Sequence, residues 1–187
     1  ARIIGFTVWR QEVTEWMLAL EPAMQASAGR ALPLTAQANW WRMLAYVLIV
    51  RRDPAARHAA EQAVSLWRRE GNRTRLQAAL GDLVRAIAEP GPALDEACAE
   101  LQRSAAEGVG SAADAVRVQG ALAQAAYVRG DLNARLACRE EELRLARSIG
   151  QSDQADAAET NVCAALMDLG RHAEAAARAR ALVQRLG

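Results

Sequence analysis

Regularly spaced glycines constrain the fold of this chain more than any other feature of its sequence. Two interleaved series, each with a spacing of 39 or 40 residues, run along it: Gly71, Gly110 and Gly150, and, 20 residues after each, Gly91, Gly130 and Gly170. Glycine adopts at little cost the left-handed conformation that ends many helices. The two series therefore predict helices that stop at regular intervals, with a repeat near 40 residues.

Residues that favour helix N-termini follow several of these glycines. Ser111, Asp131 and Ser152 can each accept a hydrogen bond from a free backbone amide, and Pro54 and Pro92 suit the first helical position. The pattern predicts helices over about 35–51, 53–70, 73–89, 92–107, 112–129, 132–148, 152–169 and 172–186. By this interpretation Gly130 and Gly170 occupy tight turns and Gly108 does not, so Gly130→Val and Gly170→Val should destabilise the chain more than Gly108→Val.

Apolar residues fall on one face of the predicted helices, as Leu76, Leu80, Leu83, Val84 and Ile87 do. A single hairpin of this size cannot bury both of its apolar faces, whereas stacked hairpins can. The abundance of alanine, leucine and arginine also favours helix. We therefore expect an all-α chain with four helical hairpins, over about 31–70, 71–109, 110–149 and 150–187.

Residues 1–30 fit this repeat less well. Ile3 to Trp9 could form a short strand, but their context favours an extended lead-in or the frayed end of a helix. An amphipathic helix is predicted over about 8–28. Because the first residue is Ala rather than Met, we expect a helix from a truncated preceding hairpin of a longer polypeptide. Its apolar stripe predicts a docking surface for upstream domains of the same polypeptide, a protein partner or a second copy in a homodimer: Trp9, Val13, Trp16, Met17, Leu20 and Met24.

The last hairpin resembles a tetratricopeptide repeat. The matching positions of the pattern N-x-x-x-x-L-x-x-x-G-R-x-x-E-A are Asn161, Leu166, Gly170, Arg171, Glu174 and Ala175. The longer period, the segment 59–73 and the pair Trp40-Trp41 are similar to the C-terminal sensor regions of bacterial ATPase-containing transcription regulators, winged-helix or similar. This resemblance implies a right-handed solenoid whose first helices line a concave binding surface. It places near that surface Trp41, Arg85, Arg117, Gln124, Tyr127 and Asp168.

Charge and composition argue against several other functions. The formal net charge is only +1, so no direct contact with nucleic acid is expected. The longest apolar run, Met43 to Val50, is too short to span a bilayer. The three cysteines form no C-x-x-C pair, which suits small buried residues in the cytoplasm. The string 108–113 matches G-x-G-x-x-A, but the helix predicted before it argues against a dinucleotide site.

No catalytic, cofactor or metal residues are predicted, because the two histidines lack partners at ligand spacing and no base accompanies Cys98 or Cys138. The sequence instead favours a non-catalytic module that binds a protein or a small effector, as the sensory or interaction region of a larger bacterial transcription regulator. The alternative is a free-standing adaptor that holds a protein partner.

Overall fold

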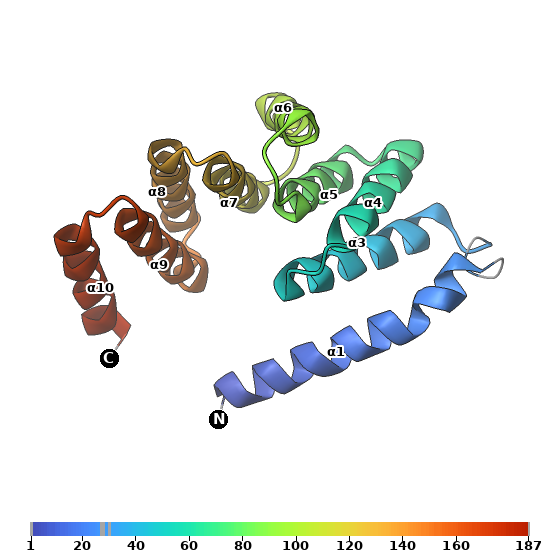
Figure 1. Cartoon of the computed structure of the whole chain (residues 1–187), viewed down its shortest axis with the longest axis horizontal. Coiled ribbons are helices and arrows are strands. Elements are labelled where there is room, and N and C mark those ends of the chain that lie inside the picture. The colour runs from blue at the N-terminus through green and yellow to red at the C-terminus, as the bar shows by residue number, and fades with distance from the viewer. Residues whose placement is uncertain (1, 27–28, 30, 187) are drawn as a thin grey trace. The chain divides into compact units, whose positions relative to one another are not determined.

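The computed structural model describes residues 2–26, 29 and 31–186, and for residues 2–12 and 14 it describes the backbone alone (Figure 1). These residues form helices and no strand, which confirms the all-α prediction. The helices are α1 (Arg2–Gln25), α3 (Leu34–Arg51), α4 (Ala56–Glu70), α5 (Arg73–Ala86), α6 (Pro92–Ala106), α7 (Ala112–Val128), α8 (Leu132–Ser148), α9 (Ser152–Asp168) and α10 (His172–Leu186).

The helices group into two compact units, Ala1–Ala86 (unit 1) and Ile87–Gly187 (unit 2). In unit 1, α3, α4 and α5 pack in chain order, and α1 contacts α3. In unit 2, each of the helices α6 to α10 packs against the next one along the chain. This succession is consistent with a helical repeat. The division falls inside the predicted hairpin 71–109, so that α5 and α6 belong to different units.

Each unit has its own core of leucine, valine, tryptophan and alanine. Leu44, Trp67 and Leu80 are fully buried in unit 1, as are Val162 and Leu166 in unit 2. Full burial of one such large apolar side chain contributes about 1.5–3 kcal/mol. Between them lie completely buried alanines, which allow helices to approach closely: Ala38, Ala45, Ala60, Ala79, Ala121, Ala123, Ala125 and Ala165.

Four helices of unit 2 end in the same paired hydrogen-bond pattern around a left-handed glycine. At the end of α7 the Gly130 amide donates to the Tyr127 carbonyl at 3.0 Å, and the Asp131 amide donates to the Ala126 carbonyl at 2.9 Å. The same two bonds recur around the glycines that end α6, α8 and α9, which are Gly108, Gly150 and Gly170. The residue that stops α6 is thus Gly108, and Gly110 only precedes α7, so the series predicted from the sequence was wrong at this turn.

The helix starts agree with the predictions in part. Ser111 and Asp114 form a capping box at the start of α7, and Asp131 caps α8 by accepting from the Ala134 amide at 2.9 Å. Ser152 does not cap α9, because the helix already begins at this residue and Gln151 holds the cap position. Likewise, α4 begins at Ala56 rather than at residue 53.

The extended lead-in considered for the first residues was wrong, since α1 is helical from Arg2 onwards. The predicted helix end at residue 28 lies outside the described residues. In α5 the helix ends at Ala86 rather than at residue 89. Pro90 disfavours helical geometry at the residue before it, and the chain leaves the helix ahead of this proline.

Candidate interaction surfaces

Three of the predicted concave-surface residues share one face of α7. Arg117, Gln124 and Tyr127 are seven and three residues apart, spacings that stack side chains along one side of a helix. Arg117 is exposed and its Nη1 donates to Asp114 Oδ1 at 2.7 Å, while 49% of Tyr127 is exposed. The structure therefore brings these three onto a common, partly open face of unit 2.

Arg135, at the start of α8, joins Tyr127 to Asp168. Its guanidinium carbon lies 4.4 Å from the centroid of the Tyr127 ring, and its Nη1 forms an ion pair with Asp168 Oδ2 at the end of α9. Burial, and next the nearby Arg139, lower the pKa of Arg135 from its ordinary value. Because Arg135 is paired with Asp168, the cluster carries no net charge. It presents instead the aromatic ring of Tyr127, which the guanidinium group holds in place. Nothing in the sequence singled out Arg135.

The other two predicted concave-surface residues, Trp41 and Arg85, belong to unit 1. Trp41 is only 9% exposed and packs edge-on against Trp40 and His58, with ring centroids 4.8 Å and 5.7 Å away. Its indole is therefore part of the core, and the expectation that it lines an open surface was wrong. Because His58 belongs to α4, the Trp41 ring lies between α3 and α4.

Arg85 is held by a buried acid. Its Nη1 donates to Asp82 Oδ1 at 3.3 Å, and Arg42 Nε on α3 donates to Asp82 Oδ2 at 2.9 Å. Asp82 is buried, so the two guanidinium groups supply the hydrogen bonds that its carboxylate would otherwise receive from water. These hydrogen bonds connect α3 to α5, and Arg85 therefore has a structural role.

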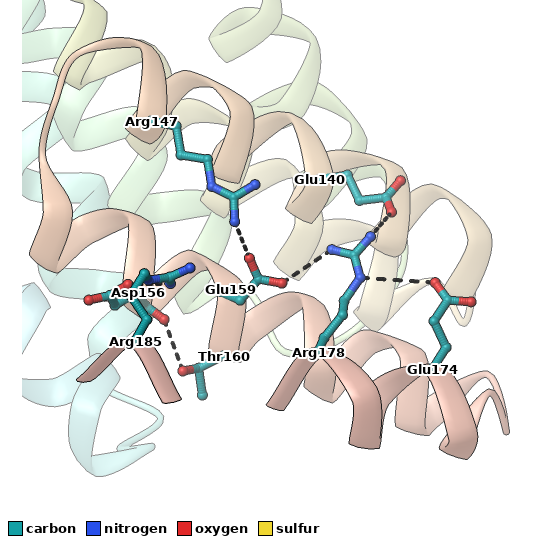
Figure 2. A network of polar contacts seen from close by, with 8 residues as sticks. All are labelled: Glu140, Arg147, Asp156, Glu159, Thr160, Glu174, Arg178 and Arg185. Atoms are coloured by element: carbon teal, nitrogen blue, oxygen red, sulfur yellow. Dashed lines mark hydrogen bonds and ion pairs between the residues drawn. The ribbon is translucent and has the colours of Figure 1, made fainter. Parts of the chain in front are cut away.

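A second buried acid organises the C-terminal helices, as Figure 2 shows. The Glu159 side chain on α9 is 6% exposed and accepts from Arg147 Nη2 on α8 at 2.5 Å and from Arg178 Nη1 on α10 at 3.3 Å. Arg178 also reaches Glu140 on α8 at 3.2 Å. One carboxylate thus connects three helices. The available signal was the position of Glu159 on the apolar face of its helix, four residues after Ala155 and three before Val162.

The predicted docking stripe on α1 contains the two most exposed large apolar side chains among those that the structure describes in unit 1. Trp16 is 66% exposed and Leu20 52%, whereas Val13, Met17 and Met24 are half-buried. The side chain of Trp9 lies outside the described residues. Most of the stripe is therefore a partly open apolar face on a helix that contacts α3.

The neighbouring helix α3 carries a second exposed apolar row, which the sequence pattern did not reveal. Met43, Tyr46 and Val50 are about half exposed and follow one another at spacings of three and four residues. That spacing places them along one side of the helix. The signal was obscured because the whole segment from Met43 to Val50 is apolar, so that its buried and exposed faces look alike in the sequence.

The thiols are poorly suited to nucleophilic chemistry. Burial raises the pKa of Cys98 and of Cys163 above the ordinary thiol value, and the same cause raises that of Cys138. A protonated thiol is a weak nucleophile and a weak metal ligand at neutral pH. Among residues 2–26, 29 and 31–186, no group of three potential ligands could hold a metal ion. Within the same ranges, no helix is both long and apolar enough to cross a membrane.

Comparison with known proteins finds no family model that matches the chain and no curated protein similar to it.

Proposed function

We propose that the chain is a non-catalytic helical-repeat module that binds a protein through unit 1, as the sensory or interaction region of a larger bacterial transcription regulator. The observation that carries this proposal is the exposure of Trp16 and Leu20 on α1. Large aromatic and aliphatic side chains that gather on one surface mark protein interaction sites, where their burial supplies most of the binding energy.

The neighbouring helix also exposes apolar side chains. α3 contacts α1 and carries Met43, Tyr46 and Val50 in an exposed row. Two contacting helices thus both present apolar side chains to solvent. Among the side chains that the structure describes, unit 1 exposes six large apolar residues, with Leu32 in addition to those on α1 and α3, whereas unit 2 exposes four: Tyr127, Met167, Val183 and Leu186. Unit 1 is therefore the better candidate for the binding unit.

The repeat architecture explains how such a module could transmit a signal. Helices that pack mainly on their chain neighbours form a structure whose curvature depends on many small interfaces. A protein or small effector bound to one part can shift the equilibrium between curvatures, provided that it binds one of them more tightly. Sequence upstream of residue 1 distinguishes the two roles, because a regulator requires an effector domain there and an adaptor does not.

A first experiment measures solution mass by light scattering for the chain and for Trp16→Glu. Without its partner, the open stripe is expected to be covered by a second copy, so the wild-type mass should exceed that of a monomer and rise with concentration. A charge at position 16 cannot be buried without a large desolvation cost and should restore the monomer.

The matched control is Met167→Glu in unit 2, since Met167 is also more than half exposed. We expect this substitution to leave the mass unchanged. A wild-type chain that is monomeric and unaffected by Trp16→Glu would show that the stripe binds nothing, and the proposal would fail.

A further inference from the structure

Positive charge gathers at the turn between α4 and α5. Four of the eight residues from 68 to 75 are arginines, all exposed: Arg68, Arg69, Arg73 and Arg75. The one acidic residue of this stretch, Glu70, accepts a hydrogen bond from the Thr35 hydroxyl at 3.1 Å. That bond joins the start of α3 to the end of α4 and partly occupies the carboxylate.

Arg69 and Arg75 differ from most exposed arginines of the chain. Several exposed arginines pair with an acid three residues away in the sequence, as Arg117, Arg144 and Arg171 do. Neither Arg69 nor Arg75 has an ion pair within the part of the chain that the structure describes. Their guanidinium groups therefore remain available to a ligand.

The position of Arg73 and Arg75 adds an electrostatic cost. Both lie in the first turn of α5, which contains no acidic residue. Cations are disfavoured there, because the first turn carries the positive end of the helix dipole. A bound carboxylate would relieve this repulsion and would pair with the guanidinium groups at the same time.

The whole of unit 1 shares this charge. It contains 12 arginines against 7 acidic residues, whereas unit 2 contains 11 arginines against 15 acidic residues. The near-zero net charge of the chain thus conceals two units of opposite sign. An excess of one sign on one unit speeds the association of oppositely charged partners and orients them.

We propose that the α4–α5 turn binds an acidic segment of a protein partner through Arg69 and Arg75, with Arg68 and Arg73 strengthening the positive field. This inference rests on the proposed protein-binding function and names the chemistry of the partner. Arginine presents a planar fork of N–H donors that matches a carboxylate in two parallel hydrogen bonds. Single-stranded nucleic acid, by contrast, is held by exposed aromatic rings beside the basic groups. The one aromatic residue next to this turn, Trp67, is completely buried.

The test measures the affinity of a fluorescent poly-glutamate peptide for the full chain by anisotropy, at low and at physiological ionic strength. A single-stranded oligothymidylate of equal charge serves as the second probe. The variants are Arg69→Glu with Arg75→Glu, and the control pair Arg103→Glu with Arg180→Glu. The control arginines, on α6 and α10, are also exposed and have no ion pair among residues 31–186. Circular dichroism verifies that each variant is folded.

We expect the peptide to bind in a salt-sensitive manner, and the reversal at 69 and 75 to weaken it at least roughly tenfold. The control pair should change the affinity less than about twofold, and Arg69→Lys with Arg75→Lys should retain part of it, since lysine keeps the charge and loses the fork. Trp16→Glu should leave peptide binding intact, which separates this test from that of the apolar stripe.

Three results would overturn the inference. Peptide affinity could be equal in the reversal variant and the wild type, which would remove the turn from binding. The oligothymidylate could bind as tightly as the peptide, which would assign the turn to phosphate. The reversal could change only the solution mass of the chain, which would assign the turn to a second copy.

Discussion

At the scale of single residues, the conformation at helix ends decides which substitutions matter. Gly108 has a φ of +68° and Gly130 one of +75°, and an added Cβ would meet nothing within 4 Å at either position. The free-energy cost of a side chain at either position therefore comes from backbone strain alone. Gly108→Val was expected from the sequence to be the milder change, but the structure gives it the same cause of destabilisation as Gly130→Val and Gly170→Val.

Gly108→Val, Gly130→Val and Gly170→Val should accordingly lower the free energy of unfolding by similar amounts, about 1–2 kcal/mol or more each, because a β-branched residue is strained in the left-handed region. Urea unfolding measures the three losses. The reverse change is a control: Arg52 ends α3 with a φ of +56° and is the one described non-glycine residue with positive φ. Arg52→Gly should stabilise by up to about 1 kcal/mol, whereas Arg51→Gly, at the last helical position, should destabilise the chain. A negligible loss for Gly108→Val beside a large one for Gly130→Val would contradict this account.

At the scale of helices, the sequence located the elements of unit 2 closely. The predicted ranges 132–148, 152–169 and 172–186 differ from α8, α9 and α10 by a residue at most. Capping residues and glycines act locally, so a sequence pattern can reveal them. The partners of Glu159 could not be found in this way. Arg147 and Arg178 are 12 and 19 residues away, and their proximity depends on how three helices pack.

Among the charged residues of α8, α9 and α10, Glu159 should be the one whose substitution lowers the free energy of unfolding most. Glu159→Ala removes the acceptor that joins these helices and leaves two guanidinium groups without their buried partner, so we expect a loss of about 1–3 kcal/mol. About half of the Arg147 side chain is exposed, so solvent screens its pair with Glu159. The loss should therefore be smaller than for a fully buried pair. Glu141→Ala, which breaks an exposed pair with Arg144 on α8, should destabilise the chain far less, because solvent screens this pair. Thermal unfolding compares the two, and equal losses would show that Glu159 acts as an ordinary surface acid.

At the scale of the whole molecule, the candidate surfaces were only partly predictable. The stripe on α1 follows from helical spacing, and Trp16 and Leu20 are exposed as a docking surface requires. Spacing alone does not say which of two adjacent tryptophans faces inward, and Trp41 is the buried one while Trp40 is half-buried. Nor could it show that Arg135 joins Tyr127 to Asp168, because these residues lie on three different helices.

The charge of the two units suggests why unit 1 would serve as the binding unit. It combines exposed apolar side chains on α1 and α3 with Arg69 and Arg75 at the α4–α5 turn, which have no ion pair among the described residues. The arginines of unit 2 are instead largely engaged by acids on the same or neighbouring helices, as in the network around Glu159. The proposed binding through unit 1 would draw on both features, because apolar burial supplies affinity and an excess of positive charge attracts an acidic partner.

Hydrogen–deuterium exchange on the chain at low and high concentration tests most directly the claim that unit 1 binds through α1 and α3. Association should slow amide exchange in α1 and in the second half of α3, because covering the apolar rows of these helices suppresses their local opening. Exchange in α8, α9 and α10 should not change, and Trp16→Glu should abolish the protection in α1. Protection confined to α9 and α10, or no protection at any concentration, would contradict the claim.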